Sequence, residues 1–174
     1  MASILKVNTI QDATNSNTAL SIDTSGRVLQ PSVPAFRVGF SGNQTISSTG
    51  NNTLAWNQGT SSETESCYTQ GGFTWSSGIV TVPVAGIYHF SITLRIDSIG
   101  SGYLVAKILK NDSESGTDDM YLIDGNPAST YTNLTGSNVY KCSANDNIRI
   151  KIASSADSSY TVTQNSIFSG HFVG

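Results

Sequence analysis

The residues in this chain that could carry chemistry are few, and they do not stand at catalytic spacings. His89 and His171 are the only two histidines. No carboxylate or cysteine accompanies either one at the spacing of a zinc site or a catalytic triad. Gly-x-Ser-x-Gly and glycine-rich phosphate loops are absent as well. We therefore predict structural or surface histidines, no cofactor and no enzymatic activity.

The densest group of acidic residues is a candidate calcium site. Calcium prefers several carboxylate and carbonyl oxygens. The spacing fits no recognised calcium loop, however, and acidic turns are commonly just solvated, so both interpretations stay open. The group consists of Asp112, Glu114, Asp118, Asp119 and Asp124, of which Asp118, Asp119 and Asp124 are the metal candidates.

Four aromatic residues in predicted loops could stack on sugars or contact a receptor. They are Tyr68, Trp75, Tyr121 and Tyr131. Tyrosines also fill the cores of β-sandwiches, so a core role is the alternative. Cys67 and Cys142 are too few for a disulfide scaffold. We predict two free thiols, with a single bridge as the alternative.

Strands must position these residues, because hydrophobic side chains recur with a period of two. In residues 88–97 the even positions are apolar and the odd positions are polar, which is typical of a strand with one buried face. Pro83 and Gly86 interrupt the alternation between 80–82 and this strand. Two strands that meet at a corner are the simplest explanation.

The same pattern extends from residue 35 to the C-terminus and predicts about ten short strands separated by polar turns. The segment 103–109 is apolar on both faces, with Tyr103, Val105 and Leu109 on the second face. Such a strand contacts something besides its own core. The fold class expected is an all-β sandwich.

Composition agrees with an all-β protein that does not bind nucleic acid. Charged residues make up only 12% of the 174 residues, and the formal net charge is −3. No basic run offers a site for nucleic acid. No segment is long and apolar enough for a secretory signal or a membrane span, so we expect no membrane insertion.

Residues 1–34 differ from the rest and are predicted to be a separate segment. Three short strands are expected, within 4–10, 18–23 and 26–31. Each is too short to bury much surface alone. Pro31 and Pro34 then form a stiff, extended link, so we place a domain boundary near Pro34. A disordered leader is the alternative.

Two sequence blocks of residues 35–174 resemble the globular domain of complement C1q. The first reads Gly-Ile-Tyr-His-Phe at 86–90, preceded by a glycine-led strand that ends in Pro83, with Phe73 at the place of the leading aromatic residue. The second reads Ser-Ile-Phe-Ser-Gly at 166–170. A turn around Asn145 lies where the family has Gly-Asp. The residues that carry the resemblance are Phe73, Gly86, Tyr88, Phe90, Phe168 and Gly170.

This resemblance implies a ten-stranded jelly roll, similar to C1q and tumour-necrosis-factor domains, that assembles into a homotrimer. The second apolar face of 103–109, with Tyr103, Val105 and Leu109, would then form the trimer interface. Calcium binding near the apex of the trimer is frequent in the family. No collagen-like stalk precedes the domain, which is a departure from the C1q pattern.

Residues 1–30 are similar to N-terminal segments of virion proteins from bacteriophages of marine and cyanobacterial hosts. The resemblance implies a non-enzymatic, trimeric structural protein on the virion surface, assembled in the host cytoplasm. Its N-terminal segment would bind other virion proteins, and its head would be a fibre-like tip that binds a host-surface glycan or protein. Alternatives are a capsid decoration protein and a secreted C1q-like lectin or signalling module.

Overall fold

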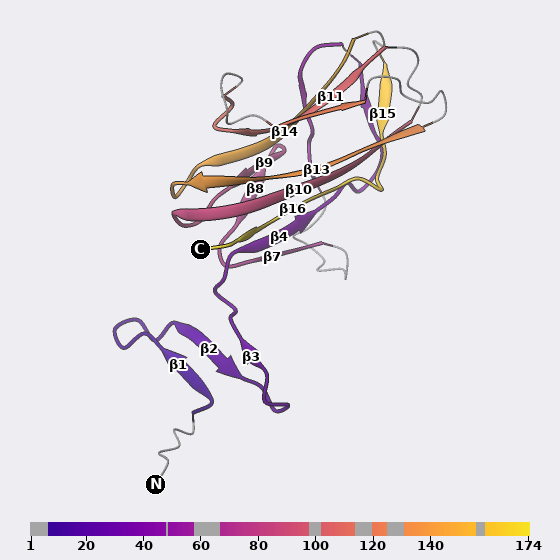
Figure 1. The fold of residues 1–174 in the computed structure, drawn as a ribbon. Coiled ribbons are helices and arrows are strands. Elements are labelled where there is room, and N and C mark those ends of the chain that lie inside the picture. The colour runs from indigo at the N-terminus through magenta and orange to yellow at the C-terminus, as the bar shows by residue number, and fades with distance from the viewer. Residues whose placement is uncertain are drawn as a thin grey trace.

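The structure, a computed structural model, describes residues 7–47, 49–57, 67–97, 102–113, 131–155 and 159–174, together with the backbone of 120–124. Every helix or strand assigned in these residues is a β-strand, as the alternating sequence predicted. Two sheets form a jelly-roll sandwich, and a small three-stranded sheet precedes them in the chain (Figure 1).

The first sheet of the sandwich is built around two long antiparallel strands that pair from Gly86↔Cys142 to Asp97↔Tyr131. Its order is β13–β10–β16–β4–β7, with β15 and β5 beside the far end of β10. The strands are β4 (Ala35–Val38), β5 (Gln44–Ile46), β7 (Tyr68–Gln70), β10 (Gly86–Asp97), β13 (Tyr131–Cys142), β15 (Tyr160–Val162) and β16 (Ile167–Phe172).

The second sheet covers the other side of the core, in the order β12–β11–β14–β9–β8. A short strand, β6, pairs with the end of β14 that β9 does not reach. The strands are β6 (Asn52–Thr53), β8 (Thr74–Ser76), β9 (Ile79–Thr81), β11 (Leu104–Lys110), β12 (Met120–Asp124) and β14 (Asn147–Ser154).

The sandwich thus has seven strands in one sheet and six in the other within the described residues, where the sequence predicted about ten in all. The closing segment, expected as one strand, divides into β15 and β16, which pair in succession with β10. β5 is only three residues long, too short for an alternating pattern to show. β12 directly follows the acidic stretch and was missed.

The interruption at Pro83 and Gly86 is a crossing between the two sheets. β9 belongs to the second sheet and β10 to the first, so the chain changes sheet at this corner. The hydroxyl of Tyr88 donates a hydrogen bond to the Val84 carbonyl at 2.9 Å and holds the turn. Glycine is required at 86 because a Cβ there would overlap the ring of Phe172 and lie 3.0 Å from the Gly174 carbonyl oxygen.

An aromatic cluster fills the space between the sheets near this corner. Phe90 is 0% exposed, and its ring centroid lies 6.0–6.2 Å from those of four other rings. A Cβ at Gly170 would approach the Phe90 ring to 2.6 Å and the Phe36 ring to 2.7 Å. The buried rings of the cluster are Phe36, Phe73, Tyr88, Phe90, Tyr140 and Phe168.

The N-terminal sheet contains β1 (Thr9–Gln11), β2 (Thr18–Ile22) and β3 (Val28–Leu29), paired antiparallel in chain order. An aspartate begins each connection between them. The Asp12 carboxylate accepts backbone N–H bonds from Thr14 and Asn15, and Asp23 accepts from Ser25 and Arg27. Such side-chain bonds stabilise tight turns, so this segment forms local sheet structure without a core of its own.

Residues 30–34 link the N-terminal sheet to the sandwich and are held by hydrogen bonds from β7 and β16. Gln70 Nε2 donates to the carbonyls of Gln30 and Val33 at 3.1 and 3.0 Å, and the Phe172 N–H donates to the Pro34 carbonyl at 2.9 Å. The N-terminal sheet stands apart from the sandwich, on the side where the C-terminus lies (Figure 1).

Candidate functional site

The outward side chains of β13, β10, β16 and β4 form a surface that we call the outer face. Along β10 the even positions from Tyr88 onward are buried and the odd positions are partly or fully exposed. Large apolar side chains nevertheless stand on this face. Ile87 is 42% exposed, Val139 is 55% exposed and Val173, just after β16, is 59% exposed. A sheet face with such residues is suited to contact with another protein surface.

The two histidines meet on the outer face. His89 on β10 is the direct register partner of His171 on β16, and their ring centroids are 5.2 Å apart at an interplanar angle of 49°. Val139 flanks the pair on one side and Ala35 on the other. The sequence predicted structural or surface histidines and did not bring the two together, because nothing in a single strand reveals which strand will lie beside it.

The other end of the outer face is polar. The guanidinium carbon of Arg95 lies 4.7 Å from the centroid of the Tyr131 ring, a cation–π contact. Arg95 Nε also lies 3.5 Å from Asp97 Oδ1. Tyr131, a predicted receptor contact, is 49% exposed here.

The predicted trimer interface on β11 is wrong for one of its three residues. Leu109 is 0% exposed, so the single chain already covers it and no surface remains for a partner. Val105 is half-buried. Tyr103, which precedes β11, is 51% exposed. The chain itself therefore covers Leu109 and leaves Tyr103 and part of Val105 accessible.

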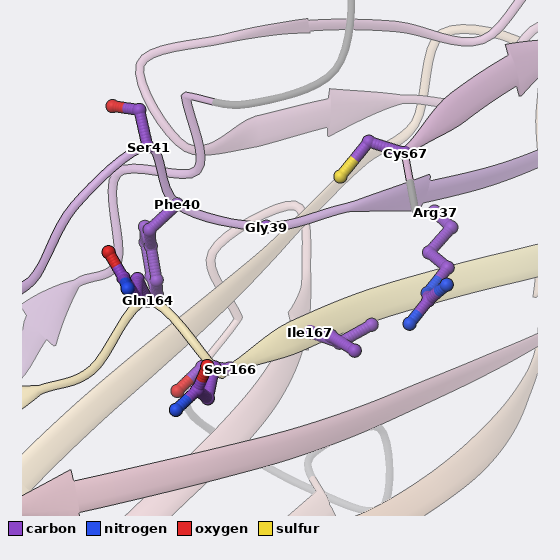
Figure 2. Close-up of a pocket in the computed structure, with 9 residues that line it drawn as sticks. Arg37, Gly39, Phe40, Ser41, Cys67, Gln164, Ser166 and Ile167 are labelled. Atoms are coloured by element: carbon purple, nitrogen blue, oxygen red, sulfur yellow. The ribbon is translucent and has the colours of Figure 1, made fainter. Parts of the chain in front are cut away.

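A pocket of about 400 Å³ lies where β4 and β16 meet the loops at the end of the sandwich. Figure 2 shows Cys67 and Arg37 on one side of it, and Ser41 and Gln164 on the other. The nine lining residues in the described part of the chain contain one cation and no carboxylate. Of the two lining serines, Ser166 is already hydrogen-bonded within the protein, because its Oγ accepts a bond from the backbone N–H of Arg95 at 3.0 Å. The pocket can bind a polar or anionic group but contains no acid–base pair.

A second hollow, which we call the Trp75 groove, lies along β8 and β9. It measures about 460 Å³ and is lined by Thr74, Trp75, Ser76, Ser77, Ile79, Thr81 and Asn147. Trp75 is half-buried and packs against the core. An aromatic side chain among hydroxyls and an amide can stack on a sugar ring and donate hydrogen bonds to it.

The four predicted receptor aromatics do not form one surface. Tyr68 and Trp75 belong to β7 and β8, the last strands of the two sheets at one side of the sandwich. Tyr121 and Tyr131 belong to β12 and β13, the last strands at the opposite side. Tyr68 is 42% exposed, whereas the side chain of Tyr121 is outside the described part of the structure.

The calcium candidates lie mostly beyond the described residues. Glu114, Asp118 and Asp119 fall in an undescribed stretch, and Asp124 ends β12, where only the backbone is described. Asp112 contacts two cations, with Lys151 Nζ at 2.7 Å and an Arg149 guanidinium nitrogen at 3.2 Å. In the part of the chain that the structure describes, no three His, Cys, Asp or Glu side chains gather as a metal site.

Asp112→Asn is expected to lower the free energy of unfolding by about 0.2–1 kcal/mol at pH 7, the range of an exposed ion pair. The hydrogen bond from Lys151 and the charge of Arg149 lower the pKa of Asp112. A carboxylate with a depressed pKa stabilises the fold above its unfolded pKa and loses this effect as the pH falls through its folded pKa. Urea unfolding at pH 7 and at about pH 3 tests this. An equal difference at both pH values would contradict it.

Both cysteines are free thiols and both are buried, in agreement with the preferred prediction. Burial raises the pKa of the Cys142 thiol to about 11, with a smaller contribution from the negative charge of Asp146. This thiol is therefore protonated at neutral pH and is a weak nucleophile.

Sequence reasoning missed the apolar part of the outer face. The odd positions of residues 88–97 were interpreted as the wetter side, which is correct for Ser91 and Thr93, but the interpretation did not extend to Ile87 on the same face. Val139 carried a signal, since it is an apolar residue among polar neighbours on the exposed parity of its strand. Arg37 carried none, because its pocket is made by segments from distant parts of the chain.

The fold and part of the sequence match known proteins. Murine APRIL has a TM-score of 0.59 at 11% identity, covering 80% of this chain and 98% of that one. The globular domain of zebrafish complement 1qA has a TM-score of 0.56 at 17% identity, covering 81% and 98%. An Eiger TNF from S. frugiperda has a TM-score of 0.56 at 14% identity, covering 83% and 94%. These identities establish the fold alone.

No curated protein sequence matches the chain significantly. Within the described residues, no helix is long and apolar enough to cross a membrane. A sequence model described as the C1q domain matches residues 35–173, nearly the whole sandwich. The N-terminal sheet of β1, β2 and β3 lies outside that match. By this match, the chain belongs to the C1q domain family.

Proposed function

We propose that the protein is a non-enzymatic homotrimer of a bacteriophage particle. Its sandwich would form a fibre-like tip that binds a glycan or protein of the host surface. Residues 1–34 would attach the tip to other virion proteins, so that it acts on the virion surface after assembly in the host cytoplasm. The observation that carries the proposal is the N-terminal sheet, which exposes apolar side chains and has no core.

The N-terminal sheet presents more apolar surface than three short strands can bury. Ile10, Ile22, Val28 and Leu29 are each between 41% and 60% exposed. A hollow of about 170 Å³ lies among these strands and is lined by Val7, Asn8, Thr9, Ile10, Leu20, Ile22 and Val28. An isolated sheet of this size is marginally stable in water. Binding to another virion protein would cover this surface.

Trimer formation is supported by the outer face. Ile87, Val139 and Val173 expose apolar surface on the first sheet. On β11 of the second sheet, by contrast, Leu109 is already buried within the single chain. A closed ring of three copies would bury this face without leaving an open edge for further growth. We therefore assign the interface to β13, β10 and β16.

Host recognition without catalysis is supported by the two hollows. Among the described residues, neither the pocket that contains Arg37 nor the Trp75 groove is lined by a carboxylate. Glycoside hydrolysis commonly needs a pair of carboxylates. Trp75 with the hydroxyls and the amide around it suits a sugar, and a neutral glycan fits this lining best.

Deleting residues 2–30 is expected to remove the protein from phage particles while the remaining chain keeps its trimer mass. Immunoblots of purified particles and multi-angle light scattering measure the two effects. The double variant Ile22→Asp/Val28→Asp, which keeps the chain length, should give the same loss of incorporation because it places charges in the apolar surface. Unchanged incorporation of both variants would exclude the attachment role, and a monomeric wild type would exclude the trimer.

A further inference from the structure

The cross-strand pair of histidines is the strongest unassigned chemical feature of the molecule. The chain has only two histidines, and the fold brings both to one point of the outer face as direct register partners on β10 and β16. His89 is half-buried and His171 is exposed. Both rings therefore remain within reach of small solutes in the single chain.

The separation of the two rings matches chelation of one metal ion. Zinc binds histidine nitrogens at about 2.0–2.1 Å. When two imidazoles bind one tetrahedral ion at about this distance, their ring centroids lie roughly 5 Å apart. The observed separation is 5.2 Å, and the rings are tilted by 49° rather than stacked flat. Rotation about the side-chain bonds is enough to direct a nitrogen of each ring to a common point.

The surroundings of the pair favour a metal ion that prefers nitrogen ligands. The register partners on either side are Val139 and Ala35, and the next pair along the strands is Ser91 and Ser169. Among the described residues in these two rows and in the row of Ile87 and Lys141, none is acidic. Calcium and magnesium prefer carboxylate oxygens, whereas imidazole suits zinc, copper and nickel.

We propose that His89 and His171 bind one late first-row divalent ion per chain, such as Zn²⁺, through one nitrogen of each imidazole. Water completes the coordination sphere in the single chain. The site goes beyond the proposed attachment function and does not need the trimer. In the proposed trimer the site lies on the face through which the three copies meet, so the bound ion is located at the interface.

Isothermal titration of the untagged full-length protein with Zn²⁺ tests the proposal. The expected result is one ion per chain for the wild type. His89→Gln and His171→Gln should each weaken binding by at least roughly tenfold, because a single imidazole cannot chelate. The double variant should not bind. The electron paramagnetic resonance spectrum of the Cu²⁺-loaded wild type should show coupling to two imidazole nitrogens, and each single variant should show one.

Cys67→Ser/Cys142→Ser is the matched control, because it removes the only thiols and should keep full Zn²⁺ binding. Light scattering of every variant separates the two proposals. A wild-type trimer that binds no Zn²⁺, or a double histidine variant that binds as tightly as the wild type, overturns the metal site. A monomer that binds one Zn²⁺ through these histidines overturns the trimer but leaves the metal site intact.

Discussion

Replacing Phe90 by alanine is expected to lower the free energy of unfolding by about 3–5 kcal/mol, the range for loss of a buried aromatic side chain. Phe90 is 0% exposed, and its ring lies at the centre of the aromatic cluster, between Tyr88, Phe36, Phe168 and Tyr140. These four rings belong to β10, β4, β16 and β13 of the first sheet, so they cannot close the cavity without moving the strands that carry them.

The measurement is chemical unfolding together with the melting temperature at a fixed chain concentration, since oligomerisation makes the Tm depend on concentration. For a chain of this size the loss corresponds to a fall in Tm of roughly 10 °C. Thr45→Ala is the control, because Thr45 is exposed on β5 of the same sheet, outside the strands assigned to the interface. A Phe90→Ala variant with the melting temperature of the wild type would show that this cluster is not the core.

The buried half of each strand could be predicted from the sequence, because burial alternates with position in the chain itself. The alternation in residues 88–97 was enough to assign Tyr88 and Phe90 to the inside, and the structure buries both completely. The corner at Pro83 and Gly86 was equally readable, because both residues have specific backbone requirements. These signals are local, so no knowledge of neighbouring strands was needed.

The outer face could not be predicted in the same way, because it depends on which strands lie side by side. His89 and His171 become partners only through the pairing of β10 with β16. An apolar residue on the second face of a strand can be covered by a partner chain or by its own chain, and the sequence pattern is the same for either. From the sequence, Leu109 was assigned to a partner interface, whereas the structure buries it within its own chain.

The outer face mixes apolar and polar side chains, and the proposed closed trimer explains this mixture. An exposed sheet face that is apolar and uncovered invites aggregation. β10 and β13 limit this by alternating Ile87 and Val139 with charged and hydroxyl side chains, such as Lys141 and Ser91, on the same face. A face of mixed character favours a specific partner over non-specific association.

Val139→Asp is therefore expected to convert the trimer into a monomer while the sandwich stays folded. Val139 is 55% exposed in the single chain, so an aspartate is tolerated there before assembly. In the trimer it would introduce three unpaired charges into the interface, each costing about 3 kcal/mol or more. The dissociation constant should rise by at least roughly a hundredfold. Multi-angle light scattering over a series of chain concentrations measures this.

Val84→Asp is the matched control, because Val84 is 45% exposed in the corner before β10, outside the strands that form the outer face. It should keep the mass of the wild-type trimer. Circular dichroism of both variants should retain the strand signal, which separates dissociation from unfolding. If Val139→Asp remains a trimer at low micromolar concentration, β13 does not contribute to the interface. If Val84→Asp dissociates as well, added charge rather than position controls assembly.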